Sequence, residues 1–262
     1  MTTRSILPRL FVSPTTRELC MILATIYALL FYFAFAVLLI GTTYNIYLYA
    51  RTPAPLKIPT MPAPRTKNGV ILRVLSEVVF FKSLFRGNKW TWLFAMMFHA
   101  SLLLITIRHL RYFIEPVWWW IVIAQPFGKY AGFVMIAGLV GLLARRIFVQ
   151  RVRYISNPSD YLMLILLLII GFSGAMLSFV VHTDIVQFKA FMLGVLYFDW
   201  QPLPNDVALL VHLSAVILLM IIFPFSKLLH APGVFFSPTR NQADDSREHR
   251  HLAPWAAKLE TK

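Results

Sequence analysis

The sequence predicts an all-α membrane protein built as a bundle of five transmembrane helices. The chain has 262 residues, of which 58% are hydrophobic and only 14% charged, and its mean hydropathy is +0.68. A soluble domain carries about 25% charged residues. Apolar runs recur along the chain, each long enough to cross a bilayer, which takes about 20 residues. The predicted spans are residues 20–49, 91–114, 128–148, 159–181 and 206–230.

The distribution of positive charge predicts how these spans are oriented. The formal net charge is +14, and a basic chain of this kind can bind nucleic acid. Here, however, Lys and Arg concentrate in alternate connections, namely residues 51–90, residues 145–153 and the segment after Lys227. This pattern is typical of the cytoplasmic loops of membrane proteins. With five spans it predicts an N-terminus outside, a C-terminus in the cytoplasm and no nucleic-acid partner.

Two parts of the chain are predicted from this topology. Residues 1–230 form one transmembrane domain that includes the cytoplasmic loop 51–90, and residues 231–262 form a cytoplasmic arm. Within the loop, residues 70–86 fit either an amphipathic surface helix or a plain basic segment. The arm combines proline, charge and large aromatic residues, so we expect it to dock on a cytoplasmic partner, with free disorder as the alternative.

Two connections are predicted on the outer side. Residues 115–126 contain three consecutive tryptophans, which favour the membrane interface, and they read as an interfacial lid or a simple anchor. Residues 182–205 read as the last outer loop. The Asn-Pro-Ser-Asp sequence at residues 157–160 is a helix-start signal that opens the fourth span.

Four histidines in the apolar runs point to the function. His99 and His109 share the second span, and His212 and His230 share the fifth. Ionisable side chains inside membrane helices are costly and mark functional sites. In a continuous helix, the eighteen residues from His212 to His230 make five full turns, so both point the same way about 27 Å apart. Antiparallel spans then pair His109 with His212 near the outer surface and His99 with His230 near the inner surface.

Two imidazoles from facing helices can ligate a haem iron from both sides, which suits electron transfer. The sequence therefore predicts two haems, with His99 and His230 on the inner iron and His109 and His212 on the outer iron. The single cysteine, Cys20, excludes c-type haem attachment and an iron–sulfur cluster held by this chain alone. A proton-relaying transporter and a cofactor-free membrane anchor are the alternatives, and no catalytic residue is predicted.

Basic side chains near the predicted outer haem are candidate partners of its propionates. Arg108 and Arg111 flank His109, and either role is open to them, pairing with propionates or snorkelling to lipid headgroups. Arg145 and Arg146 have the same choice near the inner haem, where a topology signal is the better interpretation. On sequence alone, Lys129 is an interface lysine at the start of the third span.

The histidine spacings resemble those of the gamma-subunit family of respiratory nitrate reductase. The shared features are the ten-residue His pair, the eighteen-residue His pair, and Arg145-Arg146 followed by residues 157–160. Within this family the tail is similar to that of DsrM-type subunits of the Dsr membrane complex of sulfur metabolism. The basis is Ala231-Pro232-Gly233, residues 236–242 and residues 250–255.

The resemblance implies a five-helix fold with two b haems and a quinone site beside the outer haem, where Lys129 occupies the position of a quinone-binding lysine. It also implies a bacterial or archaeal cytoplasmic membrane protein that exchanges electrons between ubiquinone or menaquinone and a cytoplasmic iron–sulfur subunit. The expected function is therefore that of a di-haem b subunit of a sulfur-metabolism redox complex. A gamma-type subunit of nitrate reductase or of another quinone-linked oxidoreductase is the alternative.

Overall fold

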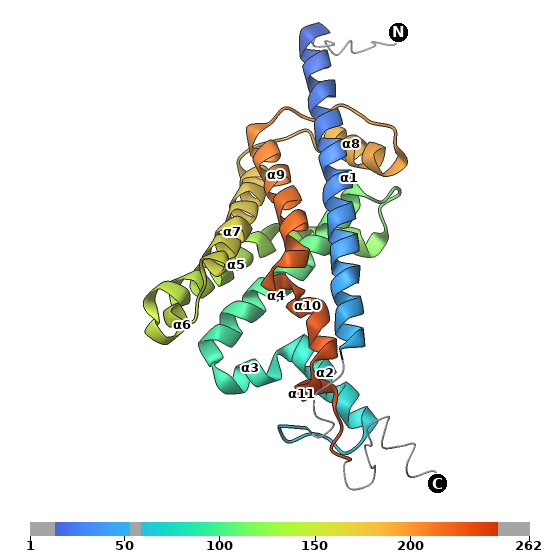
Figure 1. The fold of residues 1–262 in the computed structure, drawn as a ribbon. Helices are drawn as coiled ribbons and strands as arrows, with labels where there is room; N and C mark the ends of the chain where they lie inside the picture. The colour runs from blue at the N-terminus through green and yellow to red at the C-terminus, as the bar shows by residue number, and fades with distance from the viewer. Residues whose placement is uncertain (1–13, 53–58, 246–262) are drawn as a thin grey trace, which may run out of the picture. The chain divides into compact units, whose positions relative to one another are not determined.

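The computed structural model describes residues 14–52 and 59–245. Within these residues, five helices are long and apolar enough to cross a membrane, as predicted (Figure 1). They are α1 (Pro14–Arg51), α4 (Lys89–His109), α5 (Trp119–Phe148), α7 (Pro158–Phe179) and α9 (Val207–Ile222), the last extended by the 3₁₀ turn η2 (Phe223–Phe225). The predicted orientation of the termini remains a prediction.

Shorter elements connect the five long helices. They are α2 (Lys67–Phe80), α3 (Lys82–Gly87), η1 (Leu110–Tyr112), α6 (Gln150–Tyr154), α8 (Ile185–Tyr197), η3 (Lys227–Leu229), α10 (His230–Gly233), η4 (Val234–Phe236) and α11 (Pro238–Asn241).

The chain divides into two compact units. Unit 1 comprises Met1–Ala34 and Met97–Leu218, and unit 2 comprises Phe35–Met96 and Leu219–Lys262. The helices α1, α4 and α9 each contribute residues to both units. The predicted division into a domain 1–230 and an arm 231–262 remains a prediction, and residues 246–262 of that arm lie outside the described residues.

The core of unit 1 includes a helix that the sequence analysis treated as loop. Residues 182–205 contain α8, and Asp184 begins it by accepting hydrogen bonds from the N–H groups of Val186 and Gln187. Phe191 of α8 is completely buried in a cluster with Ala24 and Ala28 of α1 and with residues of α9. The prediction of a plain outer loop was therefore incomplete, because a thirteen-residue helix is too short to register as a span.

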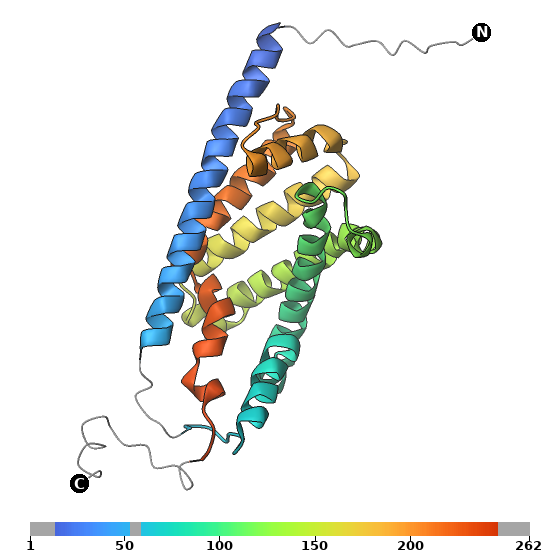
Figure 2. The same cartoon turned by 90° about the vertical axis from the view of Figure 1, so that its right-hand side faces the viewer.

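Helices α5 and α7 of unit 1 run side by side (Figure 2). Gly171 permits this approach, because a Cβ there would lie 3.1 Å from Ile136 and Met135 of α5. The predicted helix start is confirmed, since Asn157 and Asp160 form a capping box at the beginning of α7. Arg146 of α5 donates a hydrogen bond to the Asp160 carboxylate of α7 at 3.3 Å, so this arginine links the two helices.

Two predicted span boundaries were wrong. Helix α5 begins at Trp119, nine residues before the predicted start, and continues through Pro126. The lid predicted for residues 115–126 is therefore partly helical. Helix α9 ends at Ile222 and does not continue to residue 230, because the chain passes into 3₁₀ turns around Pro224. His230 consequently does not lie five helical turns beyond His212 on one continuous helix.

Unit 2 contains the loop segment and the start of the arm. The amphipathic segment predicted over residues 70–86 is two helices, α2 and α3, separated at Phe81, whose φ of 49° is left-handed. The Glu77 carboxylate accepts hydrogen bonds from the Ser83 backbone N–H at 3.0 Å and hydroxyl at 2.7 Å, which begins α3. Arg240 of α11 donates a hydrogen bond to the Glu77 carboxylate at 3.2 Å, and this ion pair connects the described part of the arm to α2.

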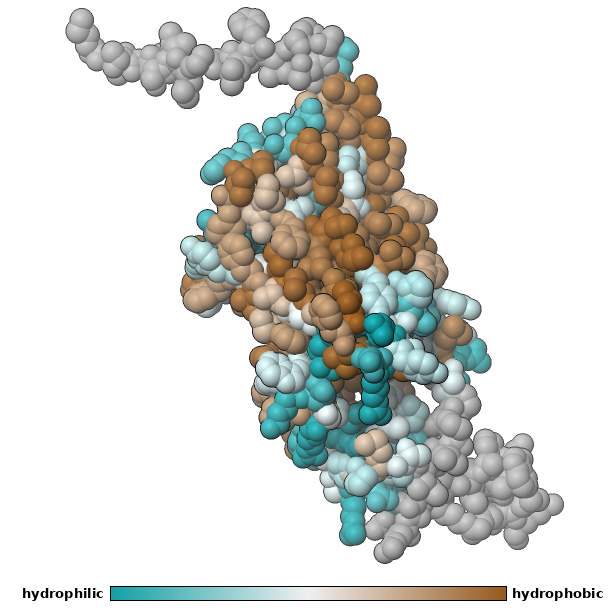
Figure 3. Space-filling model, turned by 90° about the vertical axis from the view of Figure 1, so that its left-hand side faces the viewer, coloured by the Kyte–Doolittle hydropathy of each residue, from teal (hydrophilic) through white to brown (hydrophobic). Residues whose placement is uncertain are grey.

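The surface agrees with a membrane location. Hydrophobic side chains cover much of the face in Figure 3, and the long helices expose many large apolar residues, among them Phe33, Ile40 and Leu162. Such a surface is expected where hydrocarbon replaces water as the solvent.

Candidate haem and quinone sites

The site in unit 1 is built around two histidines from different helices. His109 is the last residue of α4 and His212 lies in the first half of α9. Their ring centroids are 6.3 Å apart and their planes differ by 17°. The structure therefore brings the predicted outer pair together in unit 1, with nearly parallel rings.

Hydrogen bonding prepares the two imidazoles to act as ligands. His109 Nδ1 lies 2.7 Å from the Ile105 carbonyl oxygen, to which it can only donate. Ser173 donates its hydroxyl proton to the Ile169 carbonyl at 2.6 Å, so its oxygen can accept from His212 Nδ1 at 3.0 Å. Each ring then carries its proton on Nδ1 and presents Nε2 as the basic nitrogen. This is the arrangement that metal-binding histidines use.

The space around His212 depends on a glycine of α7. A Cβ at Gly174 would lie 3.2 Å from His212 Cε1. The two glycines of α7 thus have different roles, with Gly171 allowing α5 to approach and Gly174 making room for the His212 imidazole. Small residues that permit close helix contact are common in membrane bundles. Both glycines therefore permit close packing around α7, and Gly174 also makes room for the His212 ring.

One end of the histidine pair is covered by aromatic side chains. The His109 ring packs edge-on against Tyr112 at 5.9 Å, and Tyr112 packs edge-on against Phe188 of α8 at 4.9 Å. An ion pair between Lys189 and Glu115 also connects α8 to the segment that follows η1. Helix α8 therefore closes the site at the η1 end and limits the access of water to it.

Arg108 and Arg111 both lie beside this site and both have protein partners. Arg108 donates to the Ser178 hydroxyl at 3.3 Å. Its stem lies against Gly128, where a Cβ would come within 2.7 Å of the Arg108 Cβ. Arg111 donates to Gln125 Oε1 at 3.1 Å. Two cations are thus held at one end of the pair, as haem propionates would require, although the propionate role remains a prediction.

Lys129 lies within α5 and not at its start. Its Nζ is 4.9 Å from the centroid of the Phe179 ring at the end of α7. Tyr130 and Phe133 also pack against Phe179, with centroid distances of 5.8 Å and 4.8 Å. Arg108 donates a hydrogen bond to Ser178, the residue before Phe179. Arg108 and Lys129 therefore contact successive residues at the end of α7. An ammonium group beside an aromatic cluster can hold a flat ring with a hydrogen-bond acceptor.

The predicted inner ligands, His99 and His230, belong to different units. His99, in unit 1, packs edge-on against Phe98 with a centroid distance of 4.8 Å. His230, in unit 2, is exposed at the start of α10, and its Nδ1 lies 2.9 Å from the Lys227 carbonyl oxygen. The His230 ring therefore carries its proton on Nδ1, and its role as an iron ligand remains a prediction.

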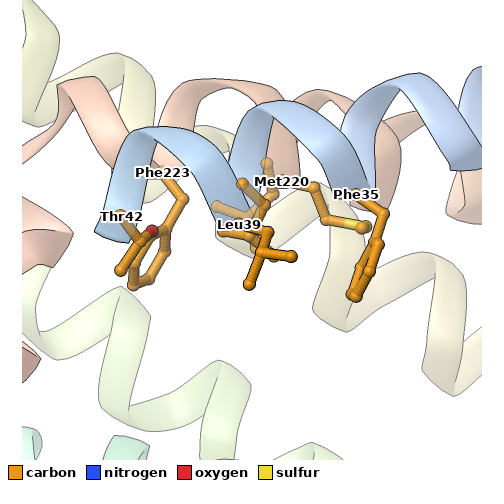
Figure 4. Close-up of a pocket in the computed structure, with 7 residues that line it drawn as sticks. Phe35, Leu39, Thr42, Met220 and Phe223 are labelled. Atoms are coloured by element: carbon orange, nitrogen blue, oxygen red, sulfur yellow. The ribbon is translucent and has the colours of Figure 1, made fainter. Parts of the chain in front are cut away.

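Unit 2 also contains an apolar cavity of about 400 Å³ that the sequence analysis did not predict (Figure 4). It is lined by Phe35, Leu38, Leu39, Thr42, Leu219, Met220 and Phe223. Its lining carries one hydroxyl, that of Thr42, whose oxygen is buried without a hydrogen-bond partner among the described residues. The cavity offers space for a hydrocarbon group and little for a polar one.

Several residues that contact the predicted site residues were not predicted from the sequence. Ser173, Gly174, Gln125 and Ser178 each contact a predicted site residue. A signal existed for two of them, because Ser173 and Gly174 interrupt the apolar run of α7 with a small polar residue and a glycine. Helix packing determines that Ser173 and Gly174 face His212, and a single sequence does not show how helices pack.

Comparisons with known proteins identify the family of the chain. Residues 82–244 match the family described as nitrate reductase gamma subunit. The chain is 35% identical to the Hdr-like menaquinol oxidoreductase cytochrome b-like subunit of Archaeoglobus profundus, over 86% of this chain and 80% of the relative. It is also 35% identical to the subunit of the same name from Archaeoglobus fulgidus, over 86% of this chain and 81% of the relative. The chain therefore belongs to the nitrate reductase gamma subunit family of cytochrome b-like membrane proteins.

Proposed function

We propose that this chain is a di-haem b membrane subunit that passes electrons between menaquinol or a related quinone and a cytoplasmic iron–sulfur partner. The observation that carries the proposal is the His109–His212 pair, with parallel rings 6.3 Å apart and both Nδ1 atoms occupied by hydrogen bonds. The similarity to subunits named as part of a menaquinol oxidoreductase supports the choice of quinone.

The chemistry of the proposal follows from what the residues hold. His109 and His212 would ligate one haem, and His99 and His230 a second one. Each haem, when bound, would supply one-electron transfer, and the two histidines of each pair would be its protein ligands. Ser173 and the Ile105 carbonyl fix the ring orientations, while α8 and Tyr112 keep water away. Arg108 and Arg111 would balance the propionate charges.

Lys129 and the Phe179 cluster are the proposed quinone site. The quinone ring would lie on the aromatic side chains, and the Lys129 ammonium would donate a hydrogen bond to a quinone oxygen. The site lies between α5 and α7, close to Ser178 and its partner Arg108. A quinone there would be near the histidine pair of unit 1.

The topology and complex are proposed as well. Lys and Arg in alternate connections favour a cytoplasmic C-terminus. The family resemblance supports a bacterial or archaeal cytoplasmic membrane. The arm then faces the cytoplasm, where an iron–sulfur subunit would dock. The tail residues favour a sulfur-metabolism complex of the Dsr type. The alternative is a nitrate reductase or another quinone-linked complex. A pull-down with this chain would then recover the iron–sulfur subunit of that complex and not a Dsr subunit.

Haem stoichiometry tests the proposal directly. The purified chain should carry two b haems per polypeptide, and His109→Ala or His212→Ala should each remove the same one. His99→Ala and His230→Ala should each remove the other. The measurement is a pyridine haemochrome assay with a redox titration, and His182→Ala, in the connection before α8, is the control that should retain both haems. A colourless, folded chain would point to the transporter or the cofactor-free anchor.

Replacing Lys129 tests the quinone site. Lys129→Ala should weaken inhibition by a quinone analogue or shift the potential of the outer haem, because the proposed donor is lost. Lys129→Arg keeps the charge and should have a smaller effect. If neither variant alters inhibition or potential, Lys129 is an interface lysine with no contact to quinone.

A further inference from the structure

Helix α2 exposes an apolar stripe that no contact in unit 2 covers among the described residues. Its members recur at helical spacing and lie within about 120° of arc, at 100° per residue. They are Ile71, Leu72, Leu75, Val78 and Val79, with exposed fractions of 57%, 67%, 49%, 38% and 53%. Five large aliphatic side chains in one stripe mark an interaction surface.

The opposite side of α2 is already occupied. Val70 is buried, and Glu77 bonds both Ser83 of α3 and Arg240 of α11. The backbone N–H of Asp244 also donates to the Pro64 carbonyl at 2.9 Å, just before α2 begins. The arm therefore uses the polar side of α2, and the apolar stripe faces away from it.

The exposed charges within the segment that carries the stripe have one sign, whereas the acidic Asp244 belongs to the arm and lies beside Pro64. Glu77 is the only acidic residue between positions 51 and 96, and it is paired with Arg240. The exposed ionisable residues of the described segment 59–89 are all basic, and they include Lys67, Lys82, Arg86 and Lys89. An aliphatic stripe flanked by Lys and Arg is typical of helices that lie in the surface of an anionic bilayer.

The end of α2 is tied to the start of a membrane span. Only Asn88 separates α3 from α4, and its side chain accepts from the Thr91 N–H at 2.9 Å. Trp92 of α4 donates its indole N–H to the Phe80 carbonyl at 2.8 Å, and it packs edge-on against Phe85 at 4.9 Å. The first turn of α4 thus holds the end of α2 at the level where a span leaves the bilayer.

We infer that the α2 stripe is a lipid-binding surface that inserts between anionic phospholipid headgroups beside the start of α4. The aliphatic side chains would enter the acyl boundary, and Lys67, Lys82 and Arg86 would contact the phosphate groups. The helix would then present its polar side, with Glu77, to the arm. Bilayer contact would in this way position the segment that follows His230.

Depth-dependent quenching in the full chain tests this inference. Cys20 is the only cysteine, so Cys20→Ser gives a background for Leu72→Cys or Leu75→Cys, each labelled with an environment-sensitive dye. The matched control is Thr239→Cys, which is exposed on α11. The haem-loaded protein is reconstituted in phosphatidylcholine vesicles with phosphatidylglycerol and brominated lipid. Haem content confirms that each variant folds.

The expected result is several-fold stronger quenching by brominated lipid at Leu72 and Leu75 than at Thr239. Quenching at Leu72 should decrease when phosphatidylglycerol is omitted or when Lys67, Lys82 and Arg86 are changed to Gln. Equal quenching at Leu72 and Thr239, or quenching of the Leu72 dye by aqueous iodide, would overturn the inference. Protection of the Leu72 dye from iodide only when partner subunits are added would assign the stripe to a protein and also overturn it.

Discussion

The histidine pair of unit 1 and the His230 segment of unit 2 show two ways to position a histidine that we propose as an iron ligand. His109 and His212 sit on regular helices, and helix packing fixes their hydrogen-bond partners. His230 follows two 3₁₀ turns and is exposed, and its ring bonds a carbonyl only three residues away. The first site is set by tertiary packing and the second by local chain geometry. Changes in the core should therefore affect the first, and changes in the arm the second.

The largest effect should follow from filling the space beside His212. In Gly174→Val the added side chain would meet the His212 ring, since even a Cβ lies 3.2 Å from Cε1. We expect loss of the outer haem with the inner haem retained, measured as one b haem per polypeptide. Gly132→Val is the matched control, because a Cβ there meets nothing within 4 Å. Equal haem loss in both variants would show that the glycines act through helix stability alone.

Removing the hydrogen-bond partner of His212 should have an intermediate effect. Ser173→Ala deletes the acceptor of the Nδ1 proton, and loss of such a supporting contact weakens metal binding by about 10–100-fold. We expect faster release of the outer haem to apo-myoglobin and a shifted potential, without a change in the inner haem. Thr106→Ala removes a hydroxyl that bonds the Leu102 carbonyl on the exposed side of α4, and it should release haem at the wild-type rate.

The smallest effect is expected at the arm. Arg240→Gln removes the ion pair with Glu77, a contact worth on the order of 1 kcal/mol. We expect faster amide exchange over residues 238–244 and a modest change in the inner-haem spectrum, while the outer haem is unaffected. Arg151→Gln, on the exposed surface of α6, should leave the exchange of residues 238–244 unchanged. A disturbed outer haem in Arg240→Gln would contradict the separation of the two regions.

The same contact predicts a pH dependence. Burial acts to raise the pKa of Glu77, but hydrogen bonds from Ser83 and the charges of Arg240 and Arg73 outweigh it, so the pKa is lowered. A lowered pKa means that the stabilisation is fully present above the ordinary value of about 4.3 and is lost as the pH falls through the folded value. Acidification in that window should loosen residues 238–244, as measured by amide exchange corrected for intrinsic rates. Arg240→Gln should show a weaker pH response.

The sequence predicted the number and order of the spans because apolar run length is a strong signal. It also predicted the neighbourhood of His109 and His212, since antiparallel helices bring equivalent depths together. It failed where local chemistry overrides hydropathy, at Pro224, which ends α9 early, and at Trp119, where helix continues into the interface. Helix α8 and the contact of Ser173 with His212 depend on tertiary packing, which a single sequence does not display.

The burial of Phe191 against Ala24 and Ala28 has a consequence for protein engineering. The segment between the last two spans packs with a complementary shape against the first helix, although more than 150 residues separate them in the chain. A chimera that imports residues 182–205 from a relative should import the matching first helix too. Otherwise a bulky ring would face a surface of the wrong contour, and the hybrid would accumulate poorly in the cell.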